Sequence, residues 1–369
     1  MIPRHERPPD YLLPPSAYFD AGWWEREQQA LFSDRWALVA SAHVLRQRGD
    51  YVARDVGRVP LVVVVGEDGE LRAFHNVCRH RGMALLAGTG RVEGSVNCFY
   101  HQWRYGLDGE LQVVPQRKEE FPDLVACDWG LLPASVALWE GLVFTHPDPD
   151  AEPLIDALAG IDSLDQGGFL GSHRPGQLHE LAVLHLDARC NWKLFVENHI
   201  DVYHLWYLHA GTLGDYDHTR FEHHQVGANW VSYEPFRSAD RAEATRAAGT
   251  IQITHLNERD RYGLGAHLAF PNLMMATSAE FFATYVAEPV GPERSMIELR
   301  IRGEAEADVG RLRSLALAFI NEDIQACEAI QRSIRSPAFR VGPLAHHHER
   351  PIETFQRNVL QRLGLDGGR

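Results

Sequence analysis

Short apolar runs separated by turn signals fill the chain between about Trp36 and Pro147. The runs read YVARDV, PLVVVV, LRAFHNV, WRYGL and ELQVV. Apolar runs of strand length with glycine or aspartate between them are typical of antiparallel β-hairpins, and Asp108-Gly109 is a favoured tight-turn pair. The pattern predicts a small all-β domain over residues 36–147.

The pattern changes after the proline- and aspartate-rich segment HPDPDAEP at 146–153. Beyond it we expect a helix near 191–206, several strands between about 250 and 302, and two helices at about 308–333 and 351–363. Strands and helices segregated in this way are typical of an α+β domain, here residues 148–369, with an antiparallel sheet flanked by helices. Residues 1–35 are predicted to form a helical arm that packs on the main body.

Composition indicates a globular protein with a sizeable core, because 45% of its 369 residues are hydrophobic. The longest uncharged apolar run, PLVVVV, is far too short to span a membrane, and the N-terminus MIPRHERPPDYLLPP has no apolar core of a signal peptide. The expected location is therefore the cytoplasm. A net charge of −14 disfavours binding to nucleic acid or anionic membranes and leaves small molecules or proteins as partners.

Cysteine and histidine usage points to metal binding. Five cysteines are too few for a disulfide framework in a chain of this length, whereas twenty histidines are many. Cys127, Cys190 and Cys327 have no ligand partners at useful spacing and are predicted to be small buried side chains.

Two Cys-His pairs form the first candidate centre. Cys78 and His80 are followed by Cys98 and His101, on what we expect to be two loops of the β domain. Two thiolates and two imidazoles are the ligands of a [2Fe–2S] cluster with mixed coordination. Zinc is the alternative, but zinc sites usually group cysteine with cysteine and histidine with histidine. Unrelated core cysteines and surface histidines remain a third interpretation.

The stretch ENHIDVYHLWYLH at 197–209 carries a second pair of histidines. His204 and His209 would lie roughly 140° apart on an ideal helix, so a helix that continues through both cannot bring them to one metal. We expect the helix to end near Trp206 and the following loop, with Gly211 and Gly214, to turn His209 back. The alternative interpretation is an ordinary surface helix whose polar face, formed by Glu197, Asn198, Asp201 and His204, is solvated.

One carboxylate in the later helix DVGRLRSLALAFINEDIQACEAIQRSI stands in an apolar stripe. Asp323 lies at the centre of the stripe, while Glu322 and Glu328 fall beside it and are expected to be solvated. The stripe comprises Leu312, Ala316, Phe319, Cys327, Ile330 and Ile334. A buried carboxylate needs a cation, either an arginine or a metal. Two histidines and one aspartate form the triad that binds Fe(II) and leaves positions open.

The strings CRHRG and CFYHQW resemble the cluster loops of the Rieske non-haem iron oxygenase α subunits, the ring-hydroxylating oxygenase family. The resemblance extends to the later histidines and the aspartate, and it implies a terminal oxygenase that uses O₂. It implies that Trp103 caps the cluster and that His204, His209 and Asp323 bind Fe(II). It also implies a homotrimer in which Asp201 joins His204 of one subunit to His101 of the next.

The resemblance further implies that electrons come from a separate reductase or ferredoxin, because the chain has no G-x-G-x-x-G unit for NAD(P)H or flavin. NAD(P)H then acts only indirectly, through the reductase. A basic patch of Arg79, Arg81 and Arg104 is either a docking site for that donor or a set of hydrogen bonds to loop carbonyls.

Several substrate classes remain open. Asp201, where some amine-oxidising relatives have glutamate, favours hydroxylation of an aromatic or heteroaromatic molecule. The alternative is oxidative demethylation of a methylated or quaternary amine, and Gln102 favours this reaction. Trp206 and Tyr207 could then hold the cationic amine over their rings. Asn198, Trp206 and Tyr207 are candidate pocket residues.

A different class of protein, an electron carrier with a ligand-binding domain, would lack the mononuclear iron. His218, His223 and His224 are expected in a surface loop, with the alternative that one of them lines the pocket or donates a proton. His346, His347 and His348 are expected to form a surface cluster.

Overall fold

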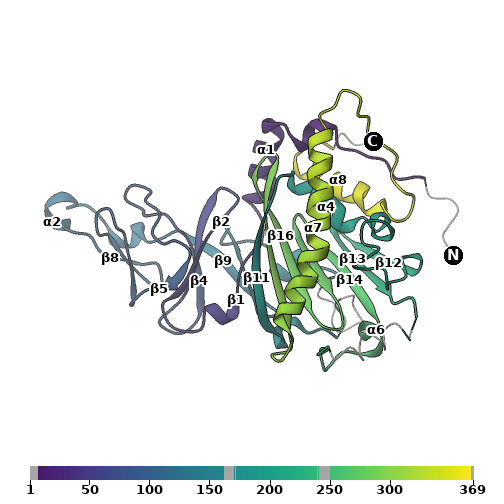
Figure 1. Ribbon diagram of the computed structural model, residues 1–369. Helices are drawn as coiled ribbons and strands as arrows, with labels where there is room; N and C mark the ends of the chain where they lie inside the picture. Colours follow the sequence, from purple (N-terminus) through teal and green to yellow (C-terminus); the bar gives the residue numbers. More distant parts are fainter. Residues whose placement is uncertain (1–6, 162–169, 171, 239, 241–249, 367–369) are drawn as a thin grey trace. The chain divides into compact units, whose positions relative to one another are not determined.

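The chain folds into two compact units, which are described separately. The computed structural model describes residues 7–161, 170, 172–238, 240 and 250–366 (Figure 1). One unit, the β unit, spans Gln28–Leu154, and the other, the α+β unit, combines Met1–Glu27 with Ile155–Arg369. Within the described part of the chain, no helix is both long and apolar enough to cross a membrane.

The β unit consists of antiparallel strands, as its hairpin pattern predicts. Seven strands form one sheet in the order β1-β10-β9-β4-β3-β2-β5, and β6-β7-β8 form a second, three-stranded sheet. The strands are β1 (Ala37–Ser41), β2 (Asp50–Val56), β3 (Val59–Val65), β4 (Leu71–His75), β5 (Thr89–Arg91), β6 (Ser95–Asn97), β7 (Arg104–Gly106), β8 (Leu111–Val113), β9 (Pro133–Trp139) and β10 (Leu142–His146). Short helical turns are η2 (Gln28–Phe32), η3 (Ala42–Val44), α2 (Arg117–Glu120) and η4 (Ala126–Trp129).

Strand β3 shows why this unit contains an uninterrupted apolar run. Val62 and Val64 face one hydrophobic cluster, while Val63 and Val65 face another. Because successive side chains point to opposite faces, a strand buried on both faces reads as continuous valine. The hydrophobic cluster around Val62 and Val64 also contains Trp103 and the candidate ligands Cys78 and Cys98. These two cysteines are therefore anchored in the core of the β unit.

The α+β unit contains a seven-stranded antiparallel sheet in the order β11-β17-β16-β15-β14-β13-β12. Its strands are β11 (His179–Ala188), β12 (Glu222–Val226), β13 (Asn229–Pro235), β14 (Gly263–Ala269), β15 (Leu273–Thr277), β16 (Phe282–Gly291) and β17 (Arg294–Gly303). The predicted fold class, α+β with an antiparallel sheet and helices, is confirmed. The sheet begins earlier than expected, because β11, β12 and β13 precede residue 250 and were not recognised in the sequence.

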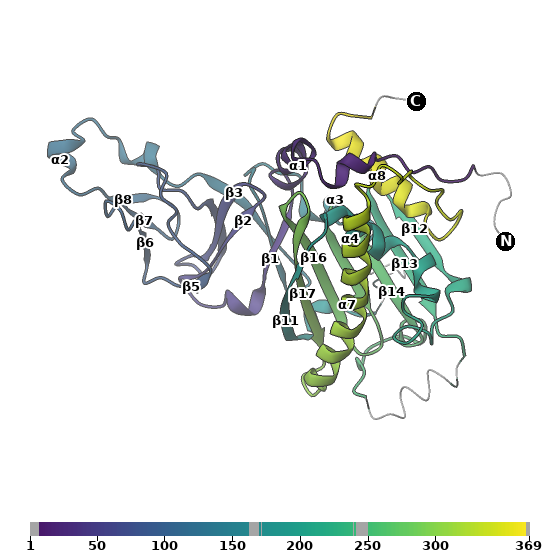
Figure 2. The same ribbon diagram turned by 45° about the horizontal axis from the view of Figure 1, so that its top comes forward.

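Helices pack on this sheet and on one another. Figure 2 shows α7 (Val309–Ser333) crossing the sheet, with α4 (Trp192–Ile200) and α8 (Arg350–Arg362) beside it. Helix α4 contacts α7, α8, β14 and β16. Shorter helical segments are η1 (Pro15–Tyr18), α1 (Ala21–Glu27), α3 (Leu154–Ala157), η6 (Pro175–Gln177), η7 (Tyr203–Trp206), η8 (His218–Arg220) and α6 (Glu258–Arg261).

Helix α4 ends earlier than predicted, and its polar face differs from the solvated face that was the alternative interpretation. It ends at Ile200 rather than near Trp206, because Asp201 adopts an extended backbone and its Oδ1 accepts a hydrogen bond from the Tyr203 amide at 2.6 Å. Its polar face is also not solvated, since Glu197 is only 6% exposed and accepts hydrogen bonds from Tyr18 and Gln356. The predicted apolar stripe of α7 is buried at most positions, but Ile330 is 46% exposed.

Candidate functional site

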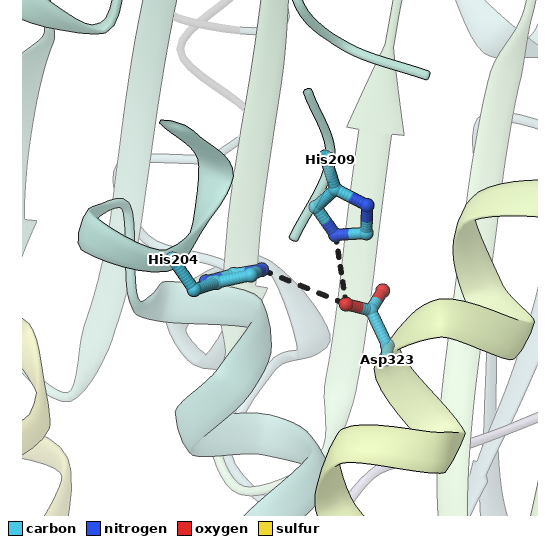
Figure 3. Close-up of side chains that lie close together, drawn as sticks. All are labelled: His204, His209 and Asp323. Atoms are coloured by element: carbon cyan, nitrogen blue, oxygen red, sulfur yellow. Dashed lines mark hydrogen bonds and ion pairs between the residues drawn. The ribbon is translucent and has the colours of Figure 1, made fainter. Parts of the chain in front are cut away.

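Two histidines and one aspartate meet between the helices and the sheet of the α+β unit. One nitrogen or oxygen atom of each of His204, His209 and Asp323 lies within 4.8 Å of the others. Asp323 Oδ1 lies 2.8 Å from His209 Nε2 and 3.5 Å from His204 Nε2. Figure 3 shows both imidazoles directed at this one carboxylate oxygen. The two histidines and the aspartate are therefore arranged as predicted for the ligands of one metal ion.

The path of the chain after α4 explains how His209 reaches the same point as His204. His204 lies on the short turn η7, and the chain then turns tightly at His209, whose carbonyl accepts from the Thr212 and Leu213 amides. Gly214 permits the turn, because a Cβ there would lie 2.4 Å from the Ala210 carbonyl oxygen. The helix ends before His209, as it must if both histidines are to reach one metal.

A second carboxylate lies behind each histidine. Asp201 Oδ2 is 3.4 Å from His204 Nδ1, and Glu322 Oε2 is 2.8 Å from His209 Nδ1. Thr212 also donates a hydrogen bond to Glu322 Oε2, at 3.0 Å. Carboxylates on the outer nitrogens fix the orientation of metal-binding imidazoles and raise their basicity. The Glu322 side chain is 35% exposed, so it is partly solvated as predicted, but it is also held against His209, which the sequence did not indicate.

The electrostatics of this group suit a cation. Burial lowers the pKa of His204, but Asp201 and Asp323 outweigh burial and raise it to about 9. The pKa of His209 is raised in the same way, against burial, by Asp323 and Glu322. Burial raises the pKa of Asp323, but the two histidines prevail and lower it. Three carboxylates around two imidazoles thus attract positive charge, which a divalent metal supplies when it replaces the protons.

A cavity of about 290 Å³ adjoins the triad. His204, His209 and Asp323 line one part of it, with Asn198 Nδ2 3.2 Å from His204 Nε2. Its remaining wall is largely apolar, with the aromatic members Phe195, Tyr216, Trp230, Phe236, Phe281, Tyr285 and Phe319. Asn198 lines the cavity as expected. The other two candidate pocket residues, Trp206 and Tyr207, do not line it, and Tyr207 is 73% exposed.

Carboxylates outnumber guanidinium groups in the cavity lining. Besides Asp323, the lining residues that the structure describes include the carboxylates of Asp215, Glu234 and Glu280, and one guanidinium, Arg311. Arg311 forms an ion pair with Glu280. No local sequence pattern indicated these residues, because they are scattered over loops, strands and α7.

His218 is the partner of Glu234 rather than a surface residue. It is 1% exposed, its Nδ1 is paired with Glu234 Oε2, and its ring lies 5.5 Å from that of Trp206. His348 packs on the other side of this group, 4.6 Å from the Trp206 ring. The surface assignments of His218 and His348 are therefore wrong, and these side chains support the turn that carries His204.

The predicted cluster ligands lie on two adjacent loops of the β unit. Cys78 and Cys98 are 2% and 1% exposed, and the rings of His80 and His101 are 4.6 Å apart. His80 Nδ1 is buried and has no hydrogen-bond partner among the described residues, as expected of a nitrogen reserved for a metal. Burial, followed by the positive charges of His101 and Arg81, lowers the pKa of His80 and favours the neutral form that binds metal. Two buried thiols and two imidazoles thus fit a [2Fe–2S] cluster.

Two aromatic residues support these loops. Trp103 is stacked on His80 at 5.0 Å and 7°, so it covers one ligand as expected. Tyr105 is fully buried, and its hydroxyl lies 3.3 Å from Cys78 Sγ and accepts from the Arg79 amide at 3.0 Å. Hydrogen bonds to ligand sulfur help to set the potential of such clusters.

The arginines near these loops differ in their contacts. Arg79 donates to the Gly130 carbonyl at 2.8 Å, which supports the carbonyl-binding interpretation, whereas Arg81 and Arg104 are exposed. Of the remaining cysteines, Cys190 and Cys327 are buried as predicted, but Cys127 is exposed, which corrects that prediction.

Comparisons with known proteins agree with both candidate centres. Residues 35–133 match the family model of the Rieske [2Fe-2S] domain, and residues 175–365 match that of the ring hydroxylating alpha subunit (catalytic domain). The carnitine monooxygenase oxygenase subunit of Escherichia coli K12 is 28% identical over 89% of this chain and 86% of its own length. The chloroplastic choline monooxygenase of Spinacia oleracea is 26% identical over 96% and 79%.

A solved structure agrees over nearly the whole chain. A quaternary ammonium Rieske monooxygenase, studied for carnitine oxidation and inter-subunit electron transfer, superimposes with a TM-score of 0.80 at 25% identity over 96% of both chains. The match covers both units of this chain.

Proposed function

The chain belongs to the α subunits of the Rieske-type ring-hydroxylating oxygenases, and from this premise we propose that it oxidises a small methylated, quaternary amine. It is an oxidoreductase with one Rieske [2Fe–2S] cluster and one mononuclear iron. Cys78, His80, Cys98 and His101 hold the cluster in this proposal, and His204, His209 and Asp323 hold the iron.

The chemistry of these groups defines what the protein residues must do. When bound, the cluster relays single electrons from a reductase or ferredoxin, and the iron activates O₂ for insertion into a C–H bond. The residues around the iron must therefore hold a methyl group of the substrate beside the triad. They must also keep bulk water away from it, for which the largely apolar lining of the cavity is suited.

The cavity lining is the observation that carries the amine proposal. Aromatic rings and the carboxylate of Asp215 line the space, while the carboxylates of Glu280 and Glu234 are paired with Arg311 and His218. Aromatic faces beside a carboxylate favour a cation, such as a trimethylammonium group. The relatives that act on carnitine and choline favour the same class over the aromatic substrate expected from the sequence.

A pair of isosteres tests the charge of the substrate. Choline and 3,3-dimethylbutanol have the same shape, but carbon replaces the charged nitrogen in the second. With the iron-loaded protein and a surrogate reductase, we expect kcat/KM for O₂ uptake to be about tenfold or more higher with choline, because the rings and carboxylates act only on the cation. Release of product in proportion to O₂ distinguishes turnover from uncoupled reduction.

Equal or greater turnover of the neutral isostere contradicts the amine proposal. In that case a panel of neutral aromatic compounds is the next measurement, because Asp201 matches the bridging acid of ring-hydroxylating relatives and the wall of the cavity is mostly apolar. A product formed from an aromatic substrate would then restore the first expectation from the sequence.

We place Asp201 on the path of electrons into the triad. Its carboxylate lies against His204 Nδ1, on the opposite side of the ring from Asp323. In a homotrimer, the assembly that the family resemblance implies, this carboxylate would join His204 to His101 of the partner subunit. The relative studied for inter-subunit electron transfer supports this arrangement.

An Asp201→Asn variant should slow the oxidation of the reduced cluster by 10–100-fold, because the amide no longer orients and polarises His204. Stopped-flow absorbance after mixing the reduced protein with O₂ and substrate measures this rate. Asp201→Glu retains the charge and is the matched control. An unchanged rate in Asp201→Asn, with iron content equal to that of the wild type, would remove Asp201 from the path.

A further inference from the structure

The cavity beside the triad is elongated along helix α7. Four of its lining residues recur at every turn of that helix and therefore share one face: Arg311, Leu315, Phe319 and Asp323. Arg311 and Asp323 are twelve residues apart, so their backbones are separated by about 18 Å along the helix axis. The triad lies at one end of this face, where Asp323 projects from α7 toward the histidines (Figure 3). A molecule that contacts both ends must be longer than choline.

The cavity reaches the molecular surface at the other end of this face. Among the lining residues that the structure describes, Arg311 is the only exposed one, and its side chain is 40% exposed. The loop before β16 forms the rim beside it. Glu280 of this loop is buried, is paired with Arg311 and donates its amide to the Ser278 hydroxyl at 3.2 Å. Arg311 therefore marks the mouth of the cavity.

The wall between the triad and the mouth is apolar. Three residues of α7 between Arg311 and Asp323 line it: Leu315, Phe319 and Ile320. On the sheet side, Ala266 and Ala276 are directly paired across β14 and β15 and project only methyl groups into the lining. A cavity of about 290 Å³ with such a wall suits an extended alkyl chain, because the burial of each methylene group is favourable.

Arg311 can bind an anionic group in addition to Glu280. Its Nη2 donates to Glu280, but a guanidinium has five N–H donors on more than one edge. Arg300 in the same unit shows this capacity, because it forms ion pairs with both Glu180 and Glu298, at 3.0 and 2.9 Å. Since the Arg311 side chain is exposed at the mouth, a second carboxylate can approach its remaining donors.

These features together define an elongated ligand whose two ends differ. We propose that the substrate is an ω-ammonium carboxylate: its methylated ammonium lies beside the triad, its alkyl chain runs along α7, and Arg311 binds its carboxylate at the mouth. The inference rests on the proposed function for the ammonium end, and it adds the chain and the anionic end. With van der Waals contact at one end and a hydrogen bond at the other, a separation of about 18 Å leaves room for about seven methylene groups.

Four probes separate the length of the ligand from its charges. 8-(Trimethylammonio)octanoate has seven methylene groups between the ammonium and the carboxylate, whereas glycine betaine has one. In octyltrimethylammonium a methyl group replaces the carboxylate, and in 9,9-dimethyldecanoate carbon replaces the nitrogen. Calorimetry with the iron-loaded protein under anaerobic conditions gives each Kd without turnover. We expect 8-(trimethylammonio)octanoate to bind about a hundredfold more tightly than glycine betaine, because its chain is buried along α7.

A double variant, Arg311→Gln with Glu280→Gln, removes the anion-binding group without leaving an unpaired carboxylate at the rim. Its Kd for 8-(trimethylammonio)octanoate should rise about tenfold. The Kd values of octyltrimethylammonium and glycine betaine should not change, because only the long carboxylate reaches Arg311. Arg313→Gln is the matched control, since Arg313 is exposed on the same helix and does not line the cavity. Loss of its charge should change no Kd.

Leu315→Trp tests the path of the chain. Leu315 is half-buried and lies one turn from Arg311 on the lining face of α7, so a larger ring there narrows the cavity between its two ends. The Kd values of 8-(trimethylammonio)octanoate and octyltrimethylammonium should each rise about tenfold or more. Glycine betaine occupies only the end beside the triad, so its Kd should stay the same.

Several results would overturn the inference. An equal change of Kd in the double variant for 8-(trimethylammonio)octanoate and octyltrimethylammonium, or an equal rise for glycine betaine, would show that Arg311 does not bind the distant carboxylate. Tighter binding of glycine betaine than of 8-(trimethylammonio)octanoate to the wild type, or unchanged Kd values of the long probes in Leu315→Trp, would show that the ligand does not extend along α7. Preference for 9,9-dimethyldecanoate over 8-(trimethylammonio)octanoate contradicts only the amine proposal, and a rise of its Kd in the double variant would still support carboxylate binding by Arg311.

Discussion

An Asp323→Ala variant will keep the two irons and two acid-labile sulfides of its cluster and lose the mononuclear iron, and substrate-dependent O₂ uptake will fall to background. Asp323 Oδ1 is the atom toward which both histidines point. Without it, two neutral imidazoles remain, and a hard divalent iron binds them far more weakly than a site with a carboxylate. Iron and sulfide analysis, together with the visible spectrum of the cluster, measures the result.

Gln325→Ala is a suitable control, because Gln325 is exposed on the same helix and only two residues away. It should retain all of the iron and the activity. If Asp323→Ala retains the mononuclear iron, the triad assignment is wrong. If the wild type itself contains only cluster iron, the chain is an electron carrier of the kind that the sequence left open.

Breaking the buried ion pair between Glu27 and Lys193 will destabilise the α+β unit by about 3–5 kcal/mol. Both side chains are fully buried, Lys193 Nζ lies 2.5 Å from Glu27 Oε1, and Trp192 Nε1 donates to Glu27 Oε2 at 2.8 Å. Either Glu27→Gln or Lys193→Met leaves one charge in the core without its partner. The double variant should regain most of the loss, because no unpaired charge remains.

The loss in Glu27→Gln should depend on pH. Burial lowers the pKa of Lys193, against the opposing effect of Glu27, and removal of Glu27 lowers it further. Between the folded and unfolded pKa values the unfolded chain binds more protons, so the stability of the variant relative to wild type rises with pH. The deficit should therefore be larger at neutral pH than at high pH.

Denaturant or calorimetric unfolding of the α+β unit gives these free energies. Arg294→Ala is the matched control, since it breaks an ion pair with Asp187 whose side chains are 59% and 41% exposed, and should cost less than about 1 kcal/mol. Losses of that small size in both single variants would show that the buried pair does not hold the N-terminal segment on α4.

Local spacing made much of the candidate site predictable. Within each Cys-His pair, the cysteine and the histidine are only a few residues apart, so the ligand set of the [2Fe–2S] cluster can be recognised in the sequence. Asp323 could be singled out because a carboxylate in an apolar helical stripe needs a cation. The strong β3 run and the turn pairs indicated the β unit in the same way.

Other features could not be predicted, because they depend on the direction in which a side chain points. Glu322 lies next to Asp323 in sequence, but its contact with His209 depends on the turn after η7. Trp206 and Tyr207 lie between the two histidines, yet the same turn directs them away from the cavity. Glu27 and Lys193 pair across more than 160 positions of sequence, which no local pattern reveals.

By itself, the sequence determined the α+β class, the two sets of candidate ligands and the kind of metal chemistry that they suit. Only the tertiary structure decided which residues surround the substrate space and which carboxylates support the histidines. The physical reason is that ligand type and short spacing are properties of the chain, whereas the direction of a side chain is set by the packing of distant strands and turns.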